Sequence, residues 1–180
     1  MGIDRLGRPA VFLDRDGVLN VAAVKDGKPY APLSAEALIL VPGARESLER
    51  LKAAGFQLIC VTNQPEIARG NLTPAELDRM HARLSSALPL DAILVCPHDD
   101  SDRCACRKPK PGLLLRAAEQ HGISLGSSYL IGDRWRDVEA AHAAGVKAVF
   151  LDLDYDDRPP ARAPEHSART LREAVDWILR

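Results

Sequence analysis

The sequence is poor in aromatic residues, carries almost no net charge and contains no long apolar run, and each shortage excludes a class of protein. Phe, Trp and Tyr make up only 4% of the 180 residues. The 24 basic and 25 acidic side chains nearly balance, so no overall field would attract nucleic acid or an anionic membrane. No apolar stretch approaches the roughly 18 residues that cross a bilayer. From the balanced charge and the missing apolar stretch, we expect no membrane and no nucleic acid as partner.

The chain also lacks an export signal and internal repeats. Residues 1–8 are polar and have no apolar h-region, which predicts a protein that stays in the cytoplasm. The length suits one domain over residues 1–180, and no low-complexity tract divides it. Since no strong apolar surface stripe is left over for a second copy, we expect a monomer.

Apolar runs alternate along the chain with segments of helical periodicity. The apolar runs predict strands over residues 10–13, 56–61, 92–95, 129–131 and 147–151. The periodic segments predict helices over residues 42–54, 73–88, 112–121, 136–144 and 171–179, with loops over 20–41 and 152–167. This alternation is typical of an α/β fold in which helices cover both faces of a parallel sheet.

Two aspartates directly follow the first predicted strand. Asp14 and Asp16 are two positions apart and precede Gly17, which can turn the chain sharply. This order places two carboxylates at the carboxyl end of a strand, where open α/β sheets bind their ligands. One carboxylate can attack an electrophile, the other can move a proton, and together they can help to hold a divalent cation. Taken alone, the same residues could form only an acidic turn.

Three further polar clusters follow a strand or precede a helix: Thr62-Asn63-Gln64, Arg107-Lys108 and Gly132-Asp133. The first cluster offers a hydroxyl and N–H groups for phosphate oxygens, and the second offers cations for phosphoryl and sugar oxygens. Asp133 could complete a Mg²⁺ site with Asp14 and Asp16, while Asp137 is better suited to accept hydrogen bonds nearby. Each cluster alone also fits an ordinary polar loop, a solvated basic loop or an Asx turn.

Three of the four cysteines gather with a histidine within eleven positions. These residues are Cys96, His98, Cys104 and Cys106. Three sulfurs and one nitrogen match a closed tetrahedral zinc site, which is a structural kind of site, and we expect it to aim Arg107 and Lys108. A redox pair is the main alternative, but the spacing is not Cys-x-x-Cys. Cys60 lies within an apolar strand and reads as a core residue.

In this order, and over residues 11–151, the clusters resemble the motifs of the haloacid dehalogenase superfamily of phosphatases. The resemblance implies a Rossmann-like three-layer fold and a hydrolase in which Asp14 is the nucleophile that becomes an aspartyl phosphate. Asp16 would then protonate the leaving oxygen and activate water. Thr62 and Lys108 would stabilise the transferring phosphoryl group, a sensible use of a hydroxyl and a cation.

The resemblance also implies a Mg²⁺ site and a substrate class. The metal ligands would be Asp14, the backbone carbonyl of Asp16, and Asp133. Within the superfamily, the zinc loop and the stretch 62–70 are similar to two groups, the heptose 1,7-bisphosphate 7-phosphatases and the histidinol-phosphate phosphatases. The continuation 110–112 (Lys-Pro-Gly) is closer to the heptose enzymes.

The expected activity is therefore Mg²⁺-dependent removal of the 7-phosphate from D-glycero-D-manno-heptose 1,7-bisphosphate, a small sugar phosphate, with histidinol phosphate as the alternative substrate. The residues implied at the substrate are Asn63, Gln64, Arg107, Lys25 and Arg134. One departure is Pro65, where serine is common in these groups, and it bears on the sugar contacts.

The spacing of the motifs leaves no room for a cap domain. Asp14 and Thr62 are 48 positions apart, Thr62 and Lys108 are 46 apart, and predicted elements fill both intervals. The site should therefore be open to water, as hydrolysis requires and a phosphomutase does not allow. Two other possibilities are a 3′-phosphatase acting on nucleic acid ends and a catalytically silent zinc-binding module. The balanced charge counts against the first, and the full set of motif residues against the second.

Overall fold

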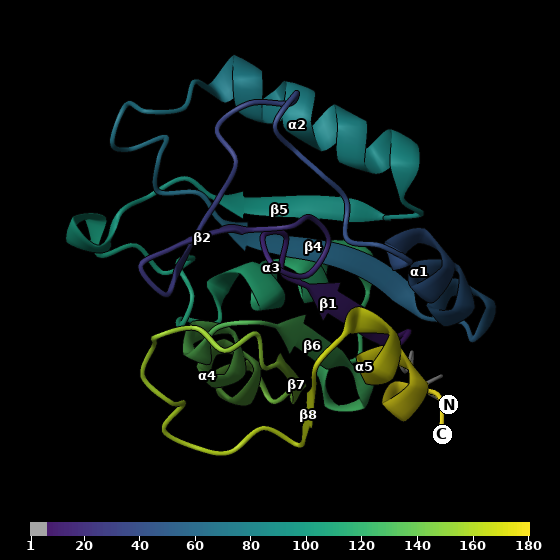
Figure 1. The fold of residues 1–180 in the computed structure, drawn as a ribbon. Coiled ribbons are helices and arrows are strands. Elements are labelled where there is room, and N and C mark those ends of the chain that lie inside the picture. Colours follow the sequence, from purple (N-terminus) through teal and green to yellow (C-terminus); the bar gives the residue numbers. More distant parts are fainter. Residues whose placement is uncertain (1–6) are drawn as a thin grey trace.

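Strands and helices alternate throughout residues 7–180, the part of the chain that the computed structural model describes (Figure 1). Of the polar segment 1–8 discussed above, residues 1–6 lie outside this part. The strands of the main sheet are β1 (Ala10–Leu13), β4 (Gln57–Asn63), β5 (Ala92–Cys96), β6 (Tyr129–Gly132), β7 (Lys147–Leu151) and β8 (His166–Ala168). The α-helices are α1 (Ala44–Ala53), α2 (Pro74–Ala87), α3 (Gly112–His121), α4 (Trp135–Ala144) and α5 (Leu171–Ile178).

The main sheet has the order β5-β4-β1-β6-β7-β8, and every neighbouring pair within it is parallel. Each parallel crossover is made through a helix, except the connection from β7 to β8, which runs over residues 152–165 without one. The predicted α/β fold with a central parallel sheet is confirmed.

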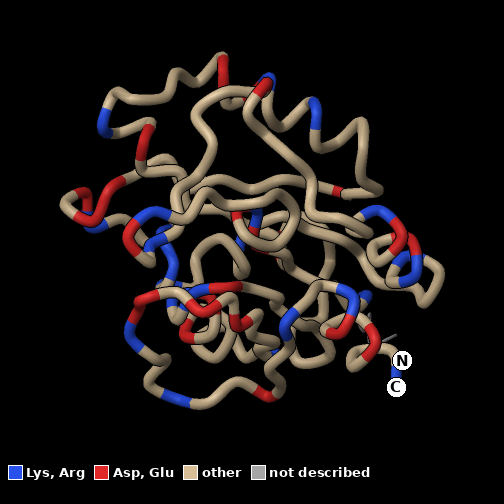
Figure 2. Tube along the Cα trace, in the orientation of Figure 1, with Lys and Arg blue, Asp and Glu red and all other residues tan. Residues whose placement is uncertain are grey.

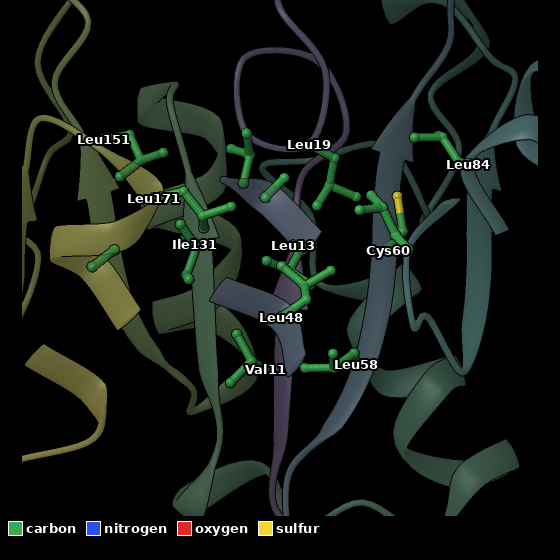
Figure 3. Close-up of a cluster of buried hydrophobic side chains, with 14 of the residues drawn as sticks. Val11, Leu13, Leu19, Leu48, Leu58, Cys60, Leu84, Ile131, Leu151 and Leu171 are labelled. Atoms are coloured by element: carbon green, nitrogen blue, oxygen red, sulfur yellow. The ribbon is translucent and has the colours of Figure 1, made fainter. Parts of the chain in front are cut away.

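Both faces of the sheet are buried, which gives the fold three layers. Along β1, Val11 and Leu13 belong to one apolar cluster, and Ala10 and Phe12 belong to the other, as the alternation of a strand requires. The first cluster packs against α1, α2 and α5, and Figure 3 shows part of it. The second packs against α3 and α4. Buried on both sides, these strands are nearly continuous apolar runs.

The structure corrects the prediction at three places. A sixth strand, β8, lies within and just beyond the segment 152–167 that reads as loop. The segment 20–41, here called the flap, contains a separate antiparallel hairpin of β2 (Ala23–Lys25) and β3 (Lys28–Tyr30). Strand β4 continues through Thr62 and Asn63, which the sequence places after the strand. The missed strands are only three residues long, too short for a periodic signal.

The strand order brings the ends of β1 and β6 together at the centre of the sheet. From β1 the chain first adds strands on one side, β4 and β5, and then on the other side, β6 to β8. Such a reversal opens a crevice at the carboxyl ends of the two central strands. Asp14 follows β1 and Asp133 follows β6, so the fold places these two carboxylates beside that crevice.

Helix α2 ties the flap to the body of the protein. Thr73 caps the helix by accepting a hydrogen bond from Glu76 N (3.2 Å), and Pro74 occupies the first helical position. The Glu76 carboxylate accepts a hydrogen bond from Ala35 N of the flap (2.6 Å). The predicted helix start therefore also serves as an anchor for the flap.

Acidic and basic positions are interspersed along residues 7–180, as Figure 2 shows. None of the helices in residues 7–180 combines the length and apolar character needed to cross a membrane.

The junction of β1 and β6 generates a stability prediction. Ser128 is fully buried, and its Oγ accepts from Ala10 N (2.9 Å) and donates to Ser124 O (2.6 Å). Ser128→Ala leaves both groups without this partner, which should lower the free energy of unfolding by about 1–3 kcal/mol. The exposed neighbour provides a control, because Ser127→Ala should change it by less than about 0.5 kcal/mol. Urea denaturation of both variants measures the difference, and equal values would contradict this role of Ser128.

Candidate active site

The buried ammonium of Lys108 holds the first aspartate of the site. Its Nζ lies 2.9 Å from Asp14 Oδ1, 2.6 Å from Asp137 Oδ1 and 2.9 Å from Val61 O. These three contacts use all three donors of an ammonium. The backbone N–H of Arg15 also donates to Asp14 Oδ1 (2.8 Å), which leaves Oδ2 directed to other partners. Asp14 therefore has one fixed oxygen and one oxygen available to an electrophile or a cation.

Three buried carboxylates share the single ammonium of Lys108. Oxygens of Asp14, Asp133 and Asp137 lie within 4.8 Å of one another. With all three ionised, the cluster carries two net negative charges. Burial, and to a lesser extent the nearby carboxylates, raises the pKa of Asp14 to about 7 against the lowering effect of Lys108. Burial and the charge of Asp14 likewise raise the pKa of Asp133 well above its ordinary value.

This shortage of positive charge fits a divalent cation. Asp133 Oδ1 is buried and has no hydrogen-bond partner among the described residues. Both oxygens of Asp137 are engaged, Oδ1 by Lys108 and Oδ2 by Arg134 N (3.0 Å), as expected for an acceptor rather than a ligand. The residues left to hold a hard cation are Asp14 and Asp133, whose carboxylate oxygens suit Mg²⁺.

The carboxylate of Asp16 lies in a separate hydrogen-bond network. Its Oδ1 accepts from Arg15 Nε (3.1 Å) and Asn20 Nδ2 (3.0 Å). Its Oδ2 accepts from Gln64 Nε2 (2.8 Å), and Arg15 also donates to both oxygens through one terminal nitrogen. Asp16 thus faces the same cleft as Asp14, but donors hold it away from the cluster around Lys108.

The polar residues at the end of β4 mainly position other groups. The Asn63 side chain donates to Lys108 O and accepts from Lys108 N, both at 3.1 Å. Gln64 is buried and donates to Asp16 and to Thr62 Oγ1 (2.9 Å). Thr62 is also buried, is not among the residues that line the cleft, and accepts through Oγ1 the hydrogen bond from Gln64. The side chains of Asn63 and Gln64 therefore have hydrogen-bond partners within the protein and need no substrate to satisfy them.

A cleft of about 820 Å³ opens above these groups. The predicted substrate residues Asn63, Gln64, Arg107 and Arg134 line it, together with Asp14, Asp16, Lys108 and Asp133. Lys25 does not belong to its lining and lies exposed on β2. The flap contributes Lys28 instead, from the other strand of the hairpin. The structure thus brings the predicted residues together, apart from Lys25.

Two arginines at the rim of the cleft meet one carboxylate. Asp100 Oδ1 lies 2.8 Å from Arg107 Nε and 3.3 Å from Arg136. Arg107 also donates to His98 O (3.3 Å), so the zinc loop holds its guanidinium at the rim. Asp100 is well exposed, and an anionic group of a ligand could therefore replace it.

The Cys/His cluster has the geometry of a tetrahedral metal site. Ligand atoms of Cys96, His98, Cys104 and Cys106 lie within 4.8 Å of one another, and Cys106 Sγ is 3.2 Å from Cys96 Sγ and 3.3 Å from His98 Nδ1. A Zn–S bond of about 2.3 Å places two sulfurs about 3.8 Å apart across a tetrahedron. The observed separations are close to that value and far longer than a disulfide. The cluster therefore fits zinc.

Residues outside the motifs also reach the site. The hydroxyl of Tyr155, from the loop after β7, lies near the Asp133 carboxylate, beside Gly17. His81 of α2 lies 3.3 Å from Arg15. Neither residue belongs to a motif of the sequence. Tyr155 gives no local signal, but His81 is spaced four residues after Leu77 and so falls on the apolar face of its helix, where a polar residue is unusual.

Comparison with known proteins identifies similar chains. The haloacid dehalogenase-like hydrolase family matches residues 13–145. The chain is 38% identical over 151 residues to the D-glycero-beta-D-manno-heptose-1,7-bisphosphate 7-phosphatase of Pseudomonas aeruginosa, covering 81% of this chain and 82% of that protein. The enzyme of the same name from Helicobacter pylori J99 is 36% identical, with 94% and 96% covered. A crystal structure of D,D-heptose 1,7-bisphosphate phosphatase from B. bronchiseptica, complexed with magnesium and phosphate, superimposes with a TM-score of 0.80 at 30% identity, covering 95% and 98% of the two chains.

The Cys/His cluster predicts a bound structural metal. Protein purified without chelators should contain about one zinc per chain, and Cys104→Ala should remove it. Removal of zinc should loosen residues 96–112 and lower activity without removing a catalytic group. Elemental analysis and proteolysis of the loop measure both effects. Cys60→Ala, outside the cluster, should keep its zinc, and a zinc-free native protein would contradict the assignment.

Proposed function

This chain belongs to the haloacid dehalogenase-like hydrolase family, and we propose that it removes the 7-phosphate from D-glycero-β-D-manno-heptose 1,7-bisphosphate with the help of Mg²⁺. The observation that carries the chemistry is the pairing of Asp14 with Lys108 inside a buried cluster that lacks positive charge. The names of the relatives, at 36% and 38% identity, support the substrate and do not favour histidinol phosphate.

In the first step, the free oxygen of Asp14 attacks the phosphorus of the 7-phosphate. The bond between phosphorus and the sugar oxygen breaks, and Asp16 gives its proton to that oxygen. Lys108 and the hydroxyl of Thr62 stabilise the charge on the phosphoryl oxygens. Mg²⁺, held by Asp14, Asp133 and the backbone carbonyl of Asp16, would supply further charge neutralisation when bound.

In the second step, a water molecule attacks the phosphorus of the aspartyl phosphate. Asp16 takes a proton from this water, the bond to Asp14 breaks, and inorganic phosphate leaves. The residues that follow β1 and β4 form only the flap hairpin, turns and a short loop, so water can reach the intermediate. Asp14 and Asp16 return to their starting protonation states.

The rim of the cleft would select the sugar. We assign Arg107 to a remote oxygen or phosphate of the substrate, because its planar guanidinium lines the cleft and its present partner Asp100 is exposed enough to be replaced by a substrate anion. Arg134 and Lys28 offer further cations along the lining. The nearly balanced net charge supports a small-molecule substrate rather than nucleic acid or an anionic membrane, and we keep the monomeric, cytoplasmic enzyme as part of the proposal.

The function is tested by comparing kcat/KM for both anomers of heptose 1,7-bisphosphate with kcat/KM for histidinol phosphate, in the presence of Mg²⁺. A strong preference for the β anomer is expected. Asp14→Asn should reduce turnover of every substrate by about 10³-fold or more, because no other group can form the covalent intermediate. A preference for histidinol phosphate would overturn the substrate assignment, and an active Asp14→Asn enzyme would overturn the nucleophile.

Arg107 gives a separate prediction about specificity. Arg107→Ala should raise KM for the heptose bisphosphate by roughly 10- to 100-fold, the value of one or two charge-assisted hydrogen bonds. KM for a simple aryl phosphate, which lacks the remote groups, should change little. Arg103→Ala, an exposed arginine of the same loop, is the matched control. Equal effects of Arg107→Ala on both substrates would show that Arg107 does not contact the sugar.

A further inference from the structure

His81 contacts the buried arginine that separates the two motif aspartates. Arg15 is fully buried, and its Nη1 lies 3.3 Å from His81 Nε2. Because a guanidinium can only donate, Nε2 must accept, and the ring is neutral with its proton on Nδ1. Burial, and then the charge of Arg15, lowers the pKa of His81 to about 4, which is consistent with a neutral ring at pH 7.

Arg15 directs two other nitrogens to Asp16. Nε is 3.1 Å from Oδ1, and Nη2 is 2.9 Å from Oδ1 and 3.0 Å from Oδ2. A planar guanidinium that contacts both oxygens fixes the plane of a carboxylate as well as its position. Since Nη1 donates to His81 while Nε and Nη2 donate to Asp16, the guanidinium cannot rotate without losing a hydrogen bond. The orientation of Asp16 is thus coupled to α2.

The other donors to Asp16 do not replace this support. Asn20 and Gln64 are uncharged, and each contacts one oxygen only. They come from the turn after β1 and from the end of β4, whereas His81 comes from a helix packed on the sheet. Proton transfer requires a heavy-atom distance of about 2.6–3.2 Å, so a small displacement of the Asp16 carboxylate is enough to slow it.

We propose that His81 is a positioning residue for the acid–base group Asp16 and acts through Arg15. The inference rests on the proposed function, because it takes Asp16 as the group that protonates the leaving oxygen. It predicts a defect confined to substrates whose leaving group needs a proton. A sugar alkoxide needs one, whereas 2,4-dinitrophenolate leaves without one.

The test compares His81→Leu with His81→Gln, since leucine removes the acceptor and glutamine places an oxygen near the position of Nε2. For His81→Leu, kcat/KM for the heptose bisphosphate should fall roughly 10-fold, while kcat/KM for 2,4-dinitrophenyl phosphate stays within about 2-fold. This parameter reports the steps up to release of the first product, which include proton donation. His81→Gln should recover most of the loss. His121→Leu, at the end of α3, is the matched control and should affect neither substrate.

Several outcomes would overturn the inference. They are an unchanged His81→Leu enzyme, an equal loss on both substrates, and a loss in His81→Gln as large as in His81→Leu. Thermal unfolding of each variant confirms its fold, and His81→Met replaces His81→Leu if the latter does not fold. The wild-type enzyme separates the two proposals. If it does not hydrolyse heptose bisphosphate but hydrolyses another alkyl phosphate, the assigned substrate is wrong. That alkyl phosphate then replaces the heptose bisphosphate in the comparison of the His81 variants.

Discussion

The site depends on one buried ammonium and the groups that must surround it. A charged side chain away from water is tolerated only when it is paired and its hydrogen bonds are satisfied. Lys108 meets this condition through Asp14, Asp137 and Val61 O, which come from three different segments. The requirement therefore joins the end of β1, the start of α4 and strand β4 around a single point. It also leaves an excess of negative charge, which a divalent cation is suited to balance.

Lys108 itself lies on a loop, so the loop has to be held as firmly as the strands. Three features do this. Asn63 hydrogen bonds to both backbone groups of Lys108, and the Cys/His cluster ends two residues before it. Within the loop, Asp99 pairs with Arg69 at 2.7 Å and so ties the loop to the segment after β4. A structural metal in this position would act on catalysis through the geometry of Lys108 and Arg107.

Much of the fold could be predicted because its signals are local. Helix α3 and strand β7 have the predicted bounds, since apolar periodicity and a terminal Gly122 specify them within a few residues. Strand β8 and the flap hairpin could not be predicted, because strands of three residues form only against neighbours that are distant in the chain. The sequence also could not show that Lys28, and not the predicted Lys25, lines the cleft. The position of the hairpin against the rest of the protein decides which of the two lysines faces the cleft.

By itself, the sequence determined the chemistry available, namely two carboxylates after the first strand, a lysine, a third carboxylate and a set of metal-binding thiols. Spacing along the chain also determined that no cap domain interrupts them. Only the tertiary structure decided what each side chain does. Gln64 reads as a phosphate or substrate ligand, yet it holds Asp16, and His81 belongs to no motif, yet it accepts from Arg15. The reason is physical: residue types set which hydrogen bonds are possible, whereas the partners are chosen by packing between segments far apart in the chain.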